Sequence, residues 1–418
     1  MTNAVSAVDR FAALWASLTP IGRAPSRHLD GPAGAGYLRY AWTHHDLDCR
    51  EWFVEEAYDR DLDVETDSNG NIWATWLPAG VDPNQPAVVT GSHLDSVPNG
   101  GAYDGPLGVV SSLLAIDEMR ARGDTPTVPL KLAVFAEEEG ARFGVACLGS
   151  RLLTGAITPA RALALTDDDG LRLGDAMEIA GVDPADVGPD PKRLAGIGAF
   201  IELHVEQGRS LEDSGQPVGI ASAIWPHGRY RFDFRGEGNH AGTTRMDHRH
   251  DPMLTYAYTV LAANKEARLA GAHATIGRVS VEPNATNAIP SAVSGWLDAR
   301  AADEPTLTKL VESITMKATE RAERDGTTLT MVTESMSAAT AFSPVLVDRL
   351  KAVLPEAPLL PTSAGHDAGV LAGHVPTAML FVRNPTGVSH APEEQASDED
   401  CTTGVEALAS VLAELACR

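Results

Sequence analysis

The hydrophobic positions in the first half of the chain follow two alternating patterns. Short, almost continuously apolar runs, each typical of a buried strand, occur at 71–77, 86–92, 130–136 and 199–205. Longer segments with apolar residues three or four positions apart predict helices at 36–62 and 108–122. Because strands that alternate with helices and are apolar on both sides are typical of covered parallel sheets, we predict an α/β fold with a mostly parallel sheet.

The pattern changes near residue 214. From there we predict, in chain order, strands at 217–224 and 229–235, a helix at 251–271, strands at 274–282 and 292–301, a helix at 304–325 and a strand at 327–333. The α/β pattern then resumes with a helix at 343–354, a strand at 377–383 and a helix at 401–416. We therefore expect a discontinuous larger domain, 1–213 and 334–418, with an α+β domain inserted at 214–333.

Composition and charge narrow the class of protein. With 44% hydrophobic and 22% charged residues, the chain has the composition of a globular protein. The net charge of −24 repels phosphate backbones and anionic lipids, so we expect neither nucleic acid nor a membrane as partner. No apolar run has the length of a membrane span, and the first residues lack a signal-peptide pattern, so we expect a cytoplasmic protein. The four cysteines form no CxxC pair and are expected to be reduced.

The stretch GSHLDSVPNGGAYDGPLGV, 91–109, carries the first candidate site residues. His93 and Asp95 follow a predicted strand, and Asp104 precedes a predicted helix, at the sheet edge where ligands bind in open α/β folds. Alternation along an extended chain sends His93 and Asp95 to the same side, so Asp95 would hold the second ring nitrogen of a metal-bound His93. The alternative is a turn in which these residues only cap and bend the chain.

A second candidate group is Glu137, Glu138 and Glu139 in AVFAEEEGARFG, directly after the apolar run at 130–136. Adjacent carboxylates repel one another, and a bound divalent cation is a common reason to gather them. Neighbouring residues point to opposite sides, so only one or two of the three would face one cavity. The alternative is a solvated strand end that opens a helix.

Two histidines complete the set. His204 lies in IELHVEQG at the end of an apolar run, and His390 lies in GVSHAPEE after the strand at 377–383. A single histidine in such a place is more often an ordinary core or surface residue, but four strand ends that deliver His, Asp or Glu to one sheet edge favour a metal centre. We predict two divalent ions, Mn²⁺ or Zn²⁺ with Co²⁺ or Ni²⁺ also compatible. His93 and His204 would hold one ion, Glu139 and His390 the other, and Asp104 would bridge them.

These motifs occur in a recognisable order. The set SHLDSVPNGGAYDG, AEEEGARFG, ELHVEQG, NHAGTTRMDHRHDP, PNATNAIP, SAGHDAG and GVSHAPEE, from about 60 to 395, resembles the amidohydrolase branch of the M20 metallopeptidase family. That branch holds allantoate amidohydrolases, N-carbamoyl-L-amino acid hydrolases and β-ureidopropionases. The resemblance implies a di-metal catalytic domain, an inserted lid domain through which a homodimer forms, and hydrolysis of a ureido C–N bond. A histidine at 204, where peptidases of the family carry a carboxylate, is similar to the amidohydrolase branch.

The catalytic roles follow from the chemistry and the resemblance together. Ureido carbonyls are poor electrophiles, so hydrolysis requires an activated water and a base that moves its proton. The predicted base is Glu138, which stands at the position of the family's catalytic glutamate. Asp95 belongs to the same expected catalytic set. The alternative for Glu138 is a surface carboxylate. His240, in the Gly-rich loop of RGEGNHAG, would by resemblance come from the partner subunit, contact substrate and stabilise an oxyanion. Otherwise it is an ordinary loop histidine.

Four further residues are candidate substrate contacts. Arg300 in WLDAR and Asn287 in NATNAIP have donors that suit a substrate carboxylate. The alternative for Arg300 is an ion pair with Asp298. Gln207 and the backbone at Gly365 are substrate contacts by resemblance.

The expected reaction is conversion of allantoate to ureidoglycine with release of ammonia and carbon dioxide, as in purine catabolism. The segment FVRNPTGVSHAPEE, with Arg383 before the last expected ligand, looks more like allantoate amidohydrolases than carbamoylases. An N-carbamoyl-L-amino acid hydrolase or β-ureidopropionase would use the same centre on another small ureido carboxylate. A peptidase and a non-catalytic dimeric binding protein are the remaining alternatives, the first disfavoured by His204 and the second by an intact Glu138 and five ligands.

Overall fold

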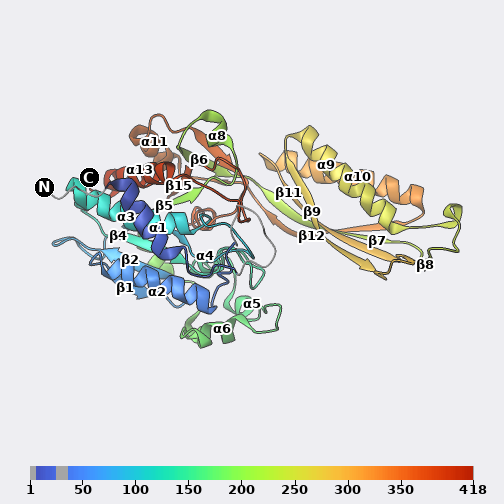
Figure 1. Cartoon of the computed structure of the whole chain (residues 1–418), viewed down its shortest axis with the longest axis horizontal. Helices are drawn as coiled ribbons and strands as arrows, with labels where there is room; N and C mark the ends of the chain where they lie inside the picture. The colour runs from blue at the N-terminus through green and yellow to red at the C-terminus, as the bar shows by residue number, and fades with distance from the viewer. Residues whose placement is uncertain (1–5, 25–35, 418) are drawn as a thin grey trace. The chain divides into compact units, whose positions relative to one another are not determined.

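The computed structural model describes residues 6–24 and 36–417, and these form two compact units (Figure 1). Unit 1 comprises the described residues up to Ser222 and from Ala341 onward, and unit 2 comprises Ala223–Thr340. Unit 1 is thus built from both ends of the chain, with unit 2 inserted between them. Among the described residues, no helix is long and apolar enough to cross a membrane.

Unit 1 is organised around a nine-stranded sheet in the order β1-β2-β4-β3-β5-β15-β6-β13, with β14 paired to β6. The strands are β1 (Asp63–Thr66), β2 (Ile72–Trp76), β3 (Ala87–His93), β4 (Leu130–Phe135), β5 (Ile197–Val205), β6 (Val218–Ile224), β13 (Thr340–Ala341), β14 (Leu359–Thr362) and β15 (Thr377–Val382). The four central strands β4, β3, β5 and β15 are parallel, whereas β1, β2 and β6 join antiparallel. This confirms the predicted largely parallel sheet, whose carboxyl ends meet at one edge.

Helices cover the sheet because its central strands are apolar on both faces. They are α1 (Ala7–Leu18), α2 (His44–Tyr58), α3 (Pro106–Arg122), α4 (Leu148–Thr154), α5 (Pro159–Leu163), α6 (Leu173–Ile179), α7 (Pro191–Ala195), α8 (Ser210–Ser214), α11 (Pro344–Val353), α12 (Asp367–Leu371) and α13 (Asp398–Ala416), with a 3₁₀ turn at Pro184–Asp186. Leu113 of α3, Ile201 of β5 and Leu408 of α13 are fully buried in one core, so α3 and α13 fix one face of the sheet.

Unit 2 is a four-stranded antiparallel sheet backed by two helices. Its strands, in the order β12-β7-β11-β9, are β7 (His227–Arg235), β9 (His273–Glu282), β11 (Ala292–Arg300) and β12 (Thr328–Ser337), and its helices are α9 (Pro252–Ala270) and α10 (Glu304–Asp325). Phe232, Phe234 and Leu297 alternate along β7 and β11 toward the helices and form the core. A small separate ladder joins β8 (Asn239–His240) to β10 (Ala288–Ile289), and a 3₁₀ turn spans Met246–His248.

Some elements differ from those predicted. The strand expected at 217–224 in the inserted domain is β6, which instead pairs with β15 in the sheet of unit 1. Apolar alternation marks a strand but does not say which sheet edge it joins, so the change of unit falls at Ser222 rather than at 213. The helix predicted at 36–62 is shorter: α2 begins after its N-cap, Thr43, and ends before its C-cap, Asp59. The short helices α4 to α8 were not predicted, since five to seven residues show little periodicity.

Candidate functional site

Four parallel strands deliver the predicted ligands to one sheet edge. His93 ends β3, Glu138 and Glu139 follow β4, His204 is the penultimate residue of β5, and His390 follows β15. The register pairs Val89 with Phe200, and four residues further along each strand His93 and His204 extend from the same face of the sheet. Their rings lie 5.9 Å apart.

Each of the two histidine rings is oriented by a backbone carbonyl. Nδ1 of His93 lies 3.1 Å from the carbonyl oxygen of Asp95, and Nδ1 of His204 lies 2.9 Å from that of Val205. A carbonyl can only accept, so Nδ1 carries a proton and Nε2 is the ring nitrogen left for a metal ion. Both Nε2 atoms are buried and make no hydrogen bond of good geometry, and each faces a carboxylate oxygen of Asp104.

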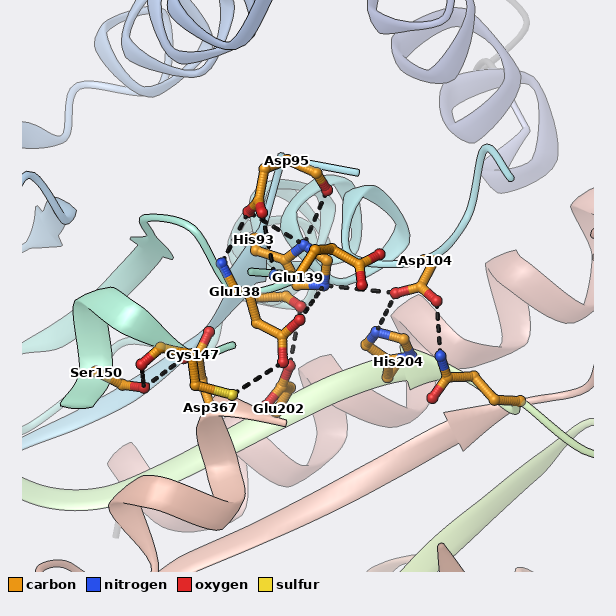
Figure 2. A network of polar contacts seen from close by, with 12 residues as sticks. His93, Asp95, Asp104, Glu138, Glu139, Cys147, Ser150, Glu202, His204 and Asp367 are labelled. Atoms are coloured by element: carbon orange, nitrogen blue, oxygen red, sulfur yellow. Dashed lines mark hydrogen bonds and ion pairs between the residues drawn. The ribbon is translucent and has the colours of Figure 1, made fainter. Parts of the chain in front are cut away.

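Asp104 belongs to two groups of potential ligands. Figure 2 shows its contacts with His93 and His204. Its Oδ1 lies 3.5 Å from Nε2 of His93 and 3.2 Å from Nε2 of His204. Its Oδ2 lies 3.4 Å from Nε2 of His390, and Nε2 of His390 lies 3.5 Å from Oε2 of Glu139. The structure thus brings all five predicted ligands together, with one carboxylate facing both groups. A mixed set of imidazole and carboxylate donors suits the divalent transition metals.

Burial differs between the two groups. The side chains of His93 and His204 are 1% exposed, whereas that of His390 is 49% exposed. His390 is therefore the predicted ligand that faces solvent, whereas Asp104 and Glu139 beside it are 7% and 6% exposed.

The charges in the cluster influence one another strongly. Although burial opposes ionisation, the facing His204 and the other two histidines hold the pKa of Asp104 well below its usual value. Burial would lower the pKa of His204, but Asp104 raises it to about 9. Asp104 is thus an anion in a buried place, where a divalent cation would be stabilised.

Glu138 and Asp95 form the other part of the centre. Oε2 of Glu138 lies 3.6 Å from Nε2 of His93, and burial raises the pKa of Glu138 to about 8. The carboxylate of Asp95 accepts hydrogen bonds from the N–H groups of Glu138 and Glu139. The sequence predicts that Asp95 holds the second ring nitrogen of His93. In the structure the backbone carbonyl of Asp95 contacts that nitrogen at 3.1 Å, and its Oδ1 forms a longer pair with it, at 3.5 Å.

Glu137, the first glutamate of the run, does not face the cluster. Glu137 has a positive φ of 52°, which turns the chain at the end of β4. Its Oε1 accepts from the N–H groups of Arg142 and Phe143 and so caps the following turn. Only Glu138 and Glu139 therefore face the cluster.

Gly105 is required by the site itself. It has a φ of 85°, and a Cβ atom there would overlap the ring of His93. Asp104 can approach the two histidines only because the next residue has no side chain.

Several buried polar residues beside the cluster were not identified from the sequence. The ring of His366 lies 4.5 Å from that of His204, and its Nε2 is buried without a partner. His366, His204 and Glu202 form a further group with ligand atoms close together. The motif SAGHDAG contains this histidine, so the sequence held a sign of it. Below Glu138, the thiol of Cys147 donates to Oε1 at 3.2 Å (Figure 2). Nothing in the sequence pattern indicated that contact.

The candidate substrate contacts of unit 1 lie beside the cluster. Nε2 of Gln207 donates to Oδ2 of Asp104 at 2.7 Å. Gly365 is exposed and precedes the buried His366, with open space around it. Arg383 does not contact the cluster residues: it donates twice to the carboxylate of Asp400 at the start of α13.

The other three candidate contacts lie in unit 2. His240 and Asn287 are exposed neighbours, because β8 pairs with β10 and the N–H of Ala241 donates to the carbonyl of Asn287. Arg300 ends β11, at the other end of the strand from this ladder, and donates twice to Asp298. Across the nine residues of β11 this separates Arg300 from the ladder by roughly 25 Å. Within one copy of the chain, Arg300 and Asn287 therefore cannot contact the same small carboxylate.

The fold and the site define a hydrolase with a candidate metal centre at the carboxyl edge of an α/β sheet. Residues 89–414 match the model of the peptidase family M20/M25/M40, and the chain belongs to this family. The resemblance seen in the sequence is thereby confirmed.

Three relatives of the chain carry three different enzyme names. It is 34% identical to an N-carbamoyl-L-amino acid amidohydrolase of Geobacillus stearothermophilus, over 96% of this chain and 98% of that protein. It is 34% identical to a ureidoglycolate hydrolase of Arabidopsis thaliana (93% and 84%) and 33% identical to an allantoate amidohydrolase of Bacillus subtilis (92% and 94%). The crystal structure of AtUAH in complex with glyoxylate superposes with a TM-score of 0.83 at 30% identity, covering 99% of this chain and 98% of that one.

Proposed function

We propose that the protein hydrolyses a ureido C–N bond of a small carboxylate, with allantoate as the substrate and ureidoglycine, ammonia and carbon dioxide as the products. The observation that carries this proposal is the placement of Asp104 between two groups of ligands, with Glu138 beside them. Hydrolysis of an unreactive ureido group needs such a combination of charge stabilisation and a base.

In this proposal His93 and His204 hold one divalent ion, Glu139 and His390 hold a second, and Asp104 contacts both. The unpartnered Nε2 atoms of His93 and His204 support the assignment. When bound, a pair of such ions polarises a carbonyl and lowers the pKa of water. Mn²⁺ and Zn²⁺ are the preferred candidates, and Co²⁺ and Ni²⁺ are compatible with the same donors.

Glu138 acts as the base. It takes a proton from the attacking water and returns it to the departing nitrogen. Asp95 holds the backbone at Glu138 and Glu139 in place, so the base keeps a fixed position relative to the ligand next to it. Attack of water on the ureido carbon breaks one C–N bond. The carbamate that remains loses carbon dioxide, so that one ureido group and one added water balance as ammonia, carbon dioxide and an amine.

Unit 2 supplies substrate contacts in a homodimer. His240 stabilises the oxyanion, and Asn287 and Arg300 bind the substrate carboxylate. The separation of Arg300 from the ladder of His240 and Asn287 supports a dimer, since two copies can bring both ends of the sheet to one substrate. Gln207 and the backbone at Gly365 contact the substrate from unit 1.

A second candidate function is hydrolysis of N-carbamoyl-L-amino acids or of N-carbamoyl-β-alanine. One observation favours it: an N-carbamoyl-L-amino acid amidohydrolase is matched over nearly its whole length. Arg383, in the segment that made allantoate the preferred substrate, is paired with Asp400 just as Arg300 is paired with Asp298, so it does not by itself favour either substrate.

The test is ammonia release by protein that has been stripped with a chelator and reloaded with Mn²⁺ or Zn²⁺. Allantoate, ureidoglycolate, N-carbamoyl-L-amino acids, N-carbamoyl-β-alanine and a dipeptide form the panel. We expect allantoate to be the preferred substrate, Glu138→Gln to abolish turnover while keeping the metal, and Glu137→Gln to remain active. Preference for a carbamoyl amino acid would replace the substrate and keep the mechanism, whereas cleavage of the dipeptide alone would contradict both.

A further inference from the structure

Glu394 lies four residues after His390 and has no part in the proposed chemistry. Its side chain is buried, and its Oε1 accepts hydrogen bonds from the N–H groups of Tyr103 at 2.8 Å and Asp104 at 2.9 Å. These bonds join residues almost three hundred positions apart in the sequence. Glu394 therefore ties the loop that carries Asp104 to the segment that carries His390.

The loop that Glu394 holds is fixed by scattered hydrogen bonds and not by regular pairing: Ser96 and Gly100, for example, bond the backbone of Arg39 and Tyr37. Residues 94–105, between β3 and α3, form no helix or strand apart from a single bridge at Gly100. A backbone without regular pairing keeps a fixed position only if its polar groups find other partners. The carboxylate of Glu394 accepts from two successive N–H groups, those of Tyr103 and Asp104, and Asp104 is the residue that faces both ligand groups.

Gly101 leaves the space that this contact needs. A Cβ atom on Gly101 would overlap the carboxyl group of Glu394. Because Gly101 is not among the residues with positive φ, an alanine there is excluded by the position of Glu394 and not by the backbone. The loop and the glutamate thus fit each other closely.

We propose that Glu394 is a positioning residue of the metal centre, which holds Asp104 where its two oxygens face the two ligand groups. Asp104 is the one predicted ligand that faces both groups. Its Oδ1 faces His93 and His204, and its Oδ2 faces His390. A small shift of its backbone would therefore disturb both groups at once. The inference rests on the proposed metal centre but assigns no part of the reaction to Glu394.

The experiment measures binding of Mn²⁺ alone to chelator-stripped full-length protein, by equilibrium dialysis and by the electron paramagnetic resonance spectrum of the bound ions. Glu394→Ala should weaken binding about 10- to 100-fold, the range found when partners of metal ligands are removed. Gly101→Ala, which displaces the same carboxyl group from the other side, should give the same loss. Glu394→Gln keeps an oxygen acceptor and should bind nearly as wild type. Glu393→Gln, at the exposed neighbour, is the matched control.

The outcomes separate the possible failures. Wild-type protein that binds no Mn²⁺ would overturn the metal centre and the role of Glu394 with it. Wild-type binding that Glu394→Ala and Gly101→Ala both leave unchanged would overturn only the positioning role. Circular dichroism and melting in chelator complete the test. If both variants have lost their fold before any metal is added, Glu394 is a structural residue and the proposal is wrong.

Discussion

The carboxylate of Asp95 bonds the backbone of Glu138: its Oδ1 accepts from the N–H of Glu138 at 3.1 Å, and Oδ2 accepts from the next N–H at the same distance. Asp95 follows β3 and Glu138 follows β4, so one side chain fixes the ends of two neighbouring strands.

Removing this carboxylate should lower turnover without removing the base. We expect Asp95→Ala to reduce kcat about 10- to 100-fold, because Glu138 loses its fixed position. Asp95→Asn keeps one acceptor oxygen and should lose less. Steady-state kinetics on the preferred substrate provide the measurement. A kcat in Asp95→Ala equal to that of wild type would show that the turn after β4 keeps its conformation without the carboxylate of Asp95.

The thiol of Cys147 should also affect the base. It donates to Oε1 of Glu138 at 3.2 Å, and a hydrogen bond of this kind contributes about 1 kcal/mol, or roughly fivefold in rate. We expect Cys147→Ala to lower kcat by about that factor with little change in KM, and Cys147→Ser to recover part of it. Cys401→Ala, at another fully buried cysteine, is the control for loss of packing. An equal decrease in both alanine variants would assign the effect to packing.

Arg300 tests the role of unit 2. If its guanidinium binds the substrate carboxylate, Arg300→Ala should raise KM at least about tenfold, since a charge-assisted pair contributes 1.4 kcal/mol or more. Arg229 is the matched control, because it also faces Asp298, at 3.7 Å, and is more exposed. Should both variants raise KM equally, the effect would come from the charge of the surface and not from a specific contact.

Metal removal should destabilise the protein. An ion that binds only the folded state contributes about 2.7 kcal/mol at one hundred times its Kd. We therefore expect chelator to lower the first melting transition in differential scanning calorimetry, and Mn²⁺ to restore it. Asp104→Asn replaces the carboxylate shared by both ligand groups with a neutral amide. In this variant, added Mn²⁺ should leave the transition temperature almost unchanged. A transition that responds to Mn²⁺ equally in wild type and variant would place the ion elsewhere.

The apolar pattern along the chain is sufficient to predict the strands of the parallel sheet and the residues that follow them. Apolar runs end directly before His93 and directly before Glu137–Glu139, and parallel strands share an edge, so the convergence of these side chains followed from the pattern alone. The count of five candidate ligands for two ions also predicted that both groups share Asp104.

The contacts between segments that are distant in the chain could not be predicted from the sequence and are seen in the folded structure alone. Periodicity reports which face of an element is buried, but it does not report the partner. For this reason the sequence placed β6 in the wrong sheet and did not indicate the two bonds from N–H groups to the carboxylate of Asp95 or the role of Glu394. Each of these three features depends on hydrogen bonds between residues that only the packing of the whole sheet brings together. A linear pattern of polar and apolar residues carries no information about which distant residues become neighbours.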